Sequence, residues 1–165
     1  MKYKITFLDY WHMSSGLSAG ARFDSIVVKD ENNIPYIPGK TLKGLIKEQY
    51  EKLNYPNIDK VFGGNEVDEG EVYFGNAYID EEEKNNIIQN NLQNYLYDVI
   101  AFTAIDEKGI AIDDSLREIE VVVPLSLYVD IIGADENITN AFKSVKRMGL
   151  NRNRGLGRCI IEELK

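Results

Sequence analysis

Two apolar spacings follow one another along this sequence, and their order is what most limits the fold. Residues 2–9 alternate between apolar and polar side chains, as a half-buried strand does. Residues 39–53 instead carry apolar side chains at the spacing of an amphipathic helix. Other segments also read as strands or helices. In chain order they are a hairpin at 24–39, a strand at 70–79, a helix at 80–97, strands around 99–104 and 118–132, a helix at 137–148 and a strand at 158–164.

This order predicts the α+β class, with helices packed on an antiparallel sheet in the ferredoxin-like manner and a glycine-rich C-terminal loop. With 165 residues, the chain is expected to form a single domain over residues 1–165. Its composition, 44% hydrophobic and 28% charged, is typical of globular proteins. No stretch approaches the roughly 20 apolar residues of a membrane span. The N-terminus resembles a strand more than a signal peptide, so we expect a cytoplasmic protein.

Cysteine and charge exclude some kinds of site and favour others. A single cysteine, Cys159, excludes an internal disulfide and a cysteine-based zinc site. The net charge of -8 argues against nucleic acid at first, but the charge is unevenly distributed. Residues 66–120 contain 15 acidic and three basic residues, whereas residues 143–158 contain six basic residues and no acidic one. We therefore expect one acidic face and one basic face.

The strongest candidate for a binding element is the loop at residues 149–157, GLNRNRGLG. Glycines let backbones approach closely, and Arg152 and Arg154 can grip phosphate with paired donors. Asn151 and Asn153 tolerate left-handed conformations and can bond ribose or base edges. The pattern fits an RNA cradle. A basic loop that only connects a helix to a strand is the alternative.

A second candidate is the start of the helix at residues 38–41, PGKT. It resembles the tail of a nucleotide-binding phosphate loop, but Ile34 stands where that motif needs glycine, so we reject a nucleotide triphosphatase. The helix start could still hold a phosphate near Lys40 and Thr41. The alternative is a plain helix N-terminus with solvated lysines.

Two further side chains near the N-terminus could take part in chemistry. His12 is the only histidine, and no orienting partner is visible beside it, so a structural or RNA-contacting role is favoured over acid–base catalysis. Asp24 follows Arg22 and precedes an apolar run. A carboxylate there could hold a divalent metal or orient a ribose hydroxyl. It could equally be a turn or capping residue.

Five segments of the sequence belong together when taken in chain order: SSGLSAG, DSIVVKDENNIPYIPGKTLKGLIKE, VFGGNEVDEGEVYFGNAYI, TAIDEKGIAIDDSLREIEVVVP and GLNRNRGLGRC. In this order they resemble the CRISPR-associated RAMP superfamily, and most closely the backbone subunit of type III RNA-targeting complexes. The resemblance runs along nearly the whole chain.

The resemblance implies a modified RNA-recognition fold whose copies stack along a guide RNA beside other effector subunits. It also implies cleavage of the paired target RNA, in which Asp24 helps to position Mg²⁺ or another divalent ion so that a ribose 2′-hydroxyl attacks the adjacent phosphate. Base pairing would supply the specificity, so the protein would contact backbone. The residues expected to contact RNA are His12, Ser15, Arg22, Lys40, Thr41, Lys43, Lys47, Asn151, Arg152, Asn153 and Arg154.

The chain also departs from the family pattern. It is shorter than the typical backbone subunit, and we expect the missing length to include the insertion that separates guide–target segments. Not every subunit of such complexes cuts RNA. Three functions therefore stay open: a target-cleaving subunit that uses Asp24, a non-catalytic RNA-binding scaffold, and a guide-processing ribonuclease that uses His12.

Overall fold

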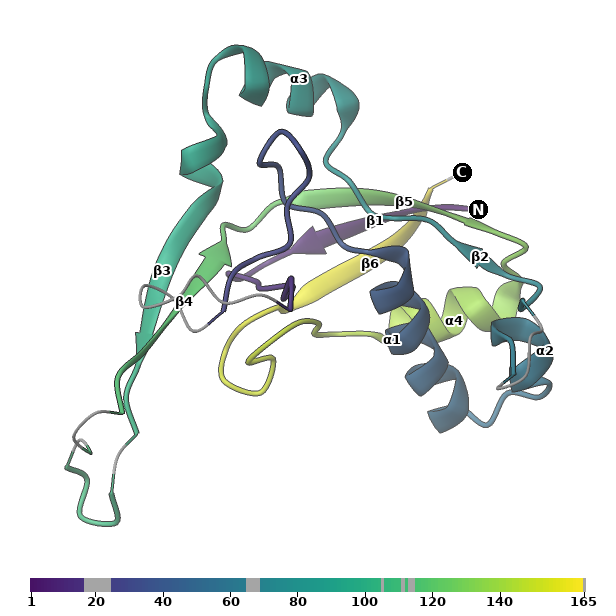
Figure 1. Ribbon diagram of the computed structural model, residues 1–165. Coiled ribbons are helices and arrows are strands. Elements are labelled where there is room, and N and C mark those ends of the chain that lie inside the picture. Colours follow the sequence, from purple (N-terminus) through teal and green to yellow (C-terminus); the bar gives the residue numbers. More distant parts are fainter. Residues whose placement is uncertain (17–24, 65–68, 105, 111, 113–114, 165) are drawn as a thin grey trace.

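The fold is built on one four-stranded antiparallel sheet. The computed structural model describes residues 1–16, 25–64, 69–104, 106–110, 112 and 115–164. The strand order in the sheet is β2-β5-β1-β6, with β5 and β1 as the two central strands (Figure 1). The strands are β1 (Lys2–Phe7), β2 (Tyr73–Phe74), β5 (Ser126–Ile132) and β6 (Cys159–Leu164). Lys4 of β1 pairs with Tyr128 on one side and Glu162 on the other.

Two helices cover one face of this sheet, α1 (Gly39–Lys52) and α4 (Glu136–Ser144) (Figure 1). The alternation of β1 places Tyr3, Ile5 and Phe7 in the core beneath them. α1 contributes apolar side chains at the predicted helical spacing, including the buried Leu42 and Ile46. Burial of both patterns against each other provides the hydrophobic driving force for the fold.

The connectivity confirms the ferredoxin-like prediction. In chain order, β1-α1-β2-β5-α4-β6 is a βαββαβ unit, and its strand order is that of the ferredoxin-like sheet. A large insertion lies between β2 and β5 and forms a second, two-stranded sheet that extends away from the body (Figure 1). The inserted elements are α3 (Glu81–Gln89), the 3₁₀ helix η1 (Gln93–Leu96), β3 (Tyr97–Phe102) and β4 (Arg117–Val122). A short helix, α2 (Ile58–Phe62), follows α1.

Some elements differ from the sequence-based expectation in length. The helix expected at 80–97 begins as predicted, with the Asp80 carboxylate accepting a hydrogen bond from the Glu82 N–H. It ends at Gln89, because Asn91 adopts a left-handed conformation with φ of 54° and interrupts it. The strand region expected at 118–132 is two strands in different sheets, with Pro124 between them.

The hairpin and the strand on either side of α1 are also more irregular than expected. In the hairpin, residues 29 and 35 form an isolated antiparallel bridge around a turn, and no continuous strand forms among residues 25–38. The strand expected at 70–79 is reduced to β2 and to single bridges at Ala77 and Tyr78. In the described part of the chain, no helix has both the length and the apolar character needed to cross a membrane.

Polar contacts fix the insertion to the body. The Lys29 ammonium lies 2.7 Å from Oε1 of Glu120 in β4 and 3.9 Å from the ring centroid of Tyr97 in β3. Lys84 of α3 pairs with Asp30 at 2.7 Å. These pairs are partly buried, so water screens them less than it screens surface pairs. The turn at residues 29–35 therefore anchors both ends of the insertion.

Candidate nucleic-acid interface

The glycine-rich loop is held against the N-terminal part of the chain by its own backbone. Leu150 N–H donates to the His12 carbonyl at 2.9 Å, and Gly157 N–H donates to the Tyr10 carbonyl at 2.8 Å. Gly149 and Gly157 have φ of 93° and 71°. A Cβ at Gly149 would overlap the His12 carbonyl oxygen, so this approach requires glycine. The predicted close backbone contact is confirmed.

This loop and α1 enclose a groove of about 340 Å³, called the basic groove here. The end of α4 and the residues after it also line the groove. Arg152 reaches α1, where its guanidinium lies 3.8 Å from Oε2 of Glu48. The groove is lined by Leu45, Glu48, Gln49, Lys52, Ser144, Val145, Lys146, Arg147, Arg152 and Asn153.

Positive charge dominates the basic groove, and only part of it is neutralised. Glu48 is shared between Lys52, at 2.6 Å, and Arg152. The hydrogen bond from Lys52 is the main reason that the pKa of Glu48 lies below its usual value. Arg147 in the groove and Arg154 at the loop tip are exposed, and neither has an ion-pair partner among the described residues. Two arginines are therefore available to an external anion.

The lysines of α1 do not line this groove, which corrects the expectation of one shared surface. The α1 residues that line it recur at positions 45, 48, 49 and 52 and so share one side of the helix. Lys40, Lys43 and Lys47 recur at the same spacing on roughly the opposite side, because successive residues are rotated by about 100°. The glycine-rich loop therefore lies along α1, but away from its lysines.

The start of α1 has fewer free donors than expected of a phosphate site. Gly39 N–H donates to the Asn76 side-chain oxygen at 2.8 Å, and Thr41 N–H donates to the Pro38 carbonyl at 2.9 Å. The exposed Lys40 side chain remains next to them. This arrangement favours the plain helix N-terminus over a preformed phosphate pocket.

His12 is a buried structural residue, which corrects the expectation that it contacts RNA. Its side chain is 0% exposed. Nδ1 lies 2.6 Å from the Glu120 carbonyl oxygen, and Nε2 lies 2.9 Å from Oγ of Ser25. Burial is the main reason that the pKa of His12 is lowered. Both ring nitrogens are engaged within the protein, so the geometry argues against the His12-dependent ribonuclease as well.

The remaining predicted contacts are spread over two regions. Asn151 adopts the left-handed conformation that we expected of it, with φ of 55°, and its carbonyl accepts the Arg154 N–H at 2.8 Å. Asn153 lines the basic groove. Ser15 is half-buried, and its N–H donates to the Ile26 carbonyl at 3.1 Å. Arg22 lies outside the described residues.

Asp24, the expected catalytic residue and metal ligand, also lies outside the described residues. Within the described ranges, no three His, Cys, Asp or Glu side chains gather as a metal site. Glu120 lies close to Ser25 but is already engaged, because one oxygen pairs with Lys29 and the other accepts the Val27 N–H at 3.0 Å. The described residues around Asp24 therefore do not form a magnesium site by themselves.

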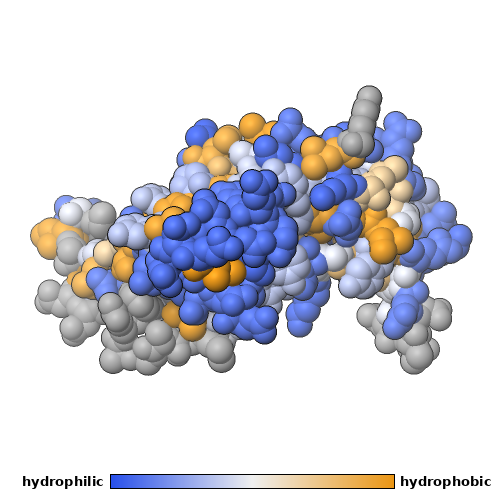
Figure 2. Space-filling model, turned by 90° about the horizontal axis from the view of Figure 1, so that it is seen from above, coloured by the Kyte–Doolittle hydropathy of each residue, from blue (hydrophilic) through white to orange (hydrophobic). Residues whose placement is uncertain are grey.

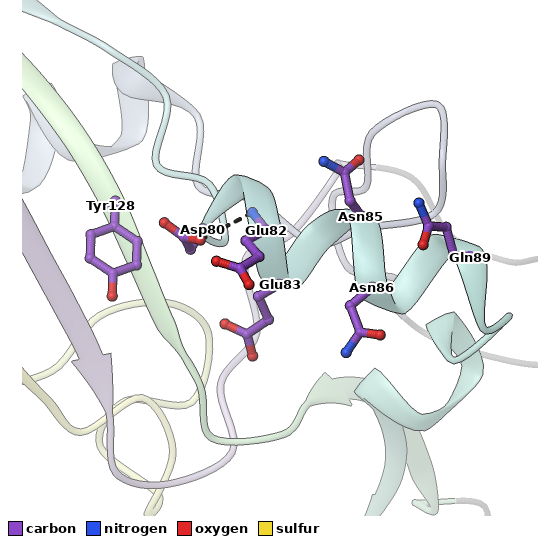
Figure 3. Close-up of a pocket in the computed structure, with 7 residues that line it drawn as sticks. All are labelled: Asp80, Glu82, Glu83, Asn85, Asn86, Gln89 and Tyr128. Atoms are coloured by element: carbon purple, nitrogen blue, oxygen red, sulfur yellow. Dashed lines mark hydrogen bonds between the residues drawn. The ribbon is translucent and has the colours of Figure 1, made fainter.

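A larger hollow of about 950 Å³, called the acidic hollow here, lies between α3 and β5 (Figure 3). Seen from above, the surface over α3 is mostly hydrophilic (Figure 2). The acidic side chains of α3 are exposed, as predicted from the uneven distribution of charge along the sequence. The hollow is lined by Asp80, Glu82, Glu83, Asn85, Asn86, Gln89 and Tyr128.

Comparison with known proteins places the chain in a family. A protein-family model described as the RAMP superfamily matches residues 4–160. No curated protein matches the chain. A chain from a cryo-EM structure of a type III-B Cmr-β complex bound to cognate target RNA is 14% identical, with a TM-score of 0.71 and coverage of 97% of this chain and 95% of that one. A chain from the apo state is 15% identical, with a TM-score of 0.66 and coverage of 98% and 95%. The family-model match over nearly the whole length shows that this chain belongs to the RAMP superfamily.

Proposed function

We propose that this protein is a guide-RNA-binding subunit of a type III CRISPR effector complex. Membership of the RAMP superfamily supports RNA binding. The fold shared with chains of type III-B assemblies supports the class of complex. Its partners are then guide RNA, complementary target RNA, other effector subunits and further copies of the chain itself.

The observation that carries this proposal is the unpaired positive charge around the basic groove. Arg147 and Arg154 are exposed without an ion-pair partner in the described structure, in a chain whose net charge is -8. Arginine forks match phosphate oxygens with paired donors, and groups of them bind a nucleic-acid backbone without reading its sequence. Such contacts suit a subunit that leaves sequence recognition to guide–target pairing.

Target cleavage is the finer part of the proposal. We propose that Asp24 cuts the paired target RNA with the help of Mg²⁺ or another divalent ion, as the family resemblance implies. The described residues add no ligand set for that ion, so this part rests on Asp24 alone. The non-catalytic scaffold is the competing function. It predicts the same RNA contacts without cleavage.

The RNA-binding proposal is tested by removing the two unpaired arginines of the basic groove and its loop, Arg147→Ala together with Arg154→Ala. We expect RNA affinity to fall roughly tenfold near physiological salt, and the salt dependence of log K to decrease by about 1.4, since each single-strand phosphate contact contributes about 0.7. Filter binding at several salt concentrations measures both quantities.

The matched control is Lys60→Ala together with Lys143→Ala. This control removes the same total charge, but from two cations that are already paired. Lys60 lies 3.1 Å from Glu71, and Lys143 lies 3.2 Å from Glu163. We expect it to bind like the wild type. An unchanged salt slope in the arginine variant would place the RNA on another surface and contradict the proposal.

The cleavage proposal is tested in the assembled complex with a complementary RNA. Asp24→Ala should abolish magnesium-dependent cutting while leaving RNA affinity unchanged, and Asp59→Ala, which removes a carboxylate from the exposed helix α2, should cut normally. Normal cutting by Asp24→Ala would favour the scaffold function instead.

A further inference from the structure

The basic groove contains one neutral side chain whose hydrogen-bonding groups are largely unused. Gln49 lines the groove from α1 and is half-buried. Its Oε1 lies 3.5 Å from Oγ of Ser144, at the outer limit of a hydrogen bond, and its Nε2 has no partner among the described residues. The Gln49 amide can therefore still accept at its oxygen and donate from its nitrogen.

The contact with Ser144 uses little of this capacity. Ser144 Oγ also lies 2.7 Å from the Ala141 carbonyl oxygen, and the single hydrogen of the hydroxyl goes to this nearer acceptor. Ser144 then has no hydrogen left for Oε1 of Gln49. Turning the Gln49 amide by half a rotation would let Nε2 donate to Ser144, and one donor and the acceptor would still be unused.

The lining of the basic groove combines charged and neutral parts. Arg147 and Lys52 supply positive charge. The neutral part includes two apolar side chains, Val145 and Leu45, and Leu45 lies about one turn before Gln49 on α1. Apolar neighbours strengthen a hydrogen bond made beside them, because they lower the local dielectric. A neutral amide thus shares one groove with the cations.

A sugar–phosphate strand has groups that match both parts of this lining. The phosphate oxygens only accept hydrogen bonds, so they match arginine and lysine, which only donate. A ribose 2′-hydroxyl both donates and accepts, as a primary amide does. The 2′-hydroxyl is also the group by which a protein distinguishes RNA from DNA at a given site. An amide beside phosphate-binding cations is therefore suited to recognise the sugar.

We propose that Gln49 binds a ribose 2′-hydroxyl and makes the basic groove selective for RNA over DNA. This inference rests on the proposed RNA-binding function of the groove. Arg147 and Arg154 bind the backbone through its charge, which DNA shares. Gln49 adds the contact that DNA cannot make. Because α1 packs in the core, this amide is presented from a fixed helix and not from the loop.

The test uses Gln49→Met in the full-length chain, because methionine keeps the length and helix propensity of glutamine and removes the amide. The probes are oligouridylate and oligodeoxyuridylate of equal length, which differ only in the 2′-hydroxyl. We expect the wild type to bind the RNA more tightly. In Gln49→Met, RNA affinity should fall about three- to tenfold, as for the loss of one hydrogen bond, and DNA affinity should stay the same. Filter binding measures both.

Two further measurements separate sugar recognition from a loss of charge. The salt dependence of RNA binding should be the same in Gln49→Met and in the wild type, because no phosphate contact is removed. The matched control is Gln89→Met, which removes the same exposed amide from the acidic hollow. It should keep the wild-type preference for RNA.

The outcomes separate the inference from the proposed function. A loss of RNA affinity alone in Gln49→Met, with an unchanged salt slope, supports the inference. If Arg147→Ala with Arg154→Ala lowers the slope while Gln49→Met keeps the preference for RNA, only the inference is overturned. Equal losses of RNA and DNA affinity in Gln49→Met also overturn it, because they indicate a structural role. If the arginine variant leaves the slope unchanged, the inference falls with the proposed function.

Discussion

The basic groove and the acidic hollow differ in size and in charge, and the two properties select different surfaces as the RNA-binding site. The acidic hollow is the larger, at about 950 Å³ against about 340 Å³. It is lined by three carboxylates and no cation. Cavity size alone would select the acidic hollow as the binding site, whereas the chemistry of a phosphate backbone selects the basic groove.

The comparison also shows how the two surfaces are built. The acidic hollow lies against α3, whose charges are local in sequence and exposed by the helix itself. The basic groove brings α1 together with the end of α4 and the glycine-rich loop, which follow about 100 residues later in the sequence. The basic groove therefore depends on the packing of the loop, and it should be the more easily disrupted of the two.

The largest expected effect comes from adding a methyl group under the loop. In Gly157→Ala, the new Cβ would overlap the Met148 carbonyl oxygen at a φ of 71°, so the loop must shift. We expect the free energy of unfolding to fall by about 3 kcal/mol, from the clash and the left-handed backbone together. Urea denaturation measures it.

Gly155→Ala is the matched control for this loop. It has a similar φ of 91°, but nothing lies within 4 Å of the added Cβ. It should cost only about 1 to 2 kcal/mol. Equal losses in the two variants would show that the loop is not packed against the body as described, and the comparison between the two surfaces would lose its basis.

Lowering the pH should have a smaller effect on the free energy of unfolding. The His12 carbonyl accepts the Leu150 N–H and so holds the loop that lines the basic groove, whereas no histidine lines the acidic hollow. Burial lowers the pKa of His12 below 6.5, so the unfolded chain binds the proton more tightly. The free energy of unfolding should therefore decrease as the pH falls through and below about 6.5.

Chemical denaturation between about pH 7.5 and 5.5 measures this effect. The carboxyls of Asp30 and Glu48 also have lowered pKa values, but they titrate below this window. In His12→Gln, the decrease over the window should be reduced. If the variant and the wild type lose stability in parallel, His12 is not the responsible group.

The smallest expected effect distinguishes the two surfaces by how RNA affinity responds when each loses one carboxylate charge. Glu48 is the carboxylate inside the basic groove, and Glu48→Gln removes its charge from Lys52 and Arg152. Stability should change by less than about 1 kcal/mol, because these are exposed pairs. RNA binding should become about two- to fourfold tighter. Glu83→Gln in the acidic hollow removes the same charge and should leave affinity nearly unchanged. Weaker binding of Glu48→Gln would show that the guide does not follow this groove.

Much of the fold was predictable because local periodicity and global packing agree. The alternation of β1 and the helical spacing of α1 each specify an apolar face that only a two-layer arrangement buries. The insertion was harder to predict. The region 118–132 is rich in apolar residues on both sides of Pro124, and only the tertiary structure shows that β4 belongs to a second sheet.

The candidate site was predictable in its parts but less so in its arrangement. The loop at 149–157 and its arginines were identified from glycine and charge, and the loop does lie along α1. The groove face of α1 was missed, because nothing in the sequence distinguishes Glu48 and Lys52 from an ordinary solvated pair at helical spacing. The helical spacing of positions 45, 48, 49 and 52 was the sequence signal that could have identified this face of α1. It marks a second, partly apolar face beside the buried one.

By itself, the amino-acid sequence determined the layers, the helix and strand order and the concentration of positive charge near the C-terminus, because these depend on short-range periodicity and composition. Only the tertiary structure decided which flank of α1 meets that charge, and that His12 is a buried support instead of an RNA contact. The first outcome depends on how the loop packs on Tyr10 and His12, more than 130 residues away in sequence. The second depends on the contact of the His12 ring with the Glu120 carbonyl, 108 residues away. Contacts of that kind leave no periodic pattern in the chain.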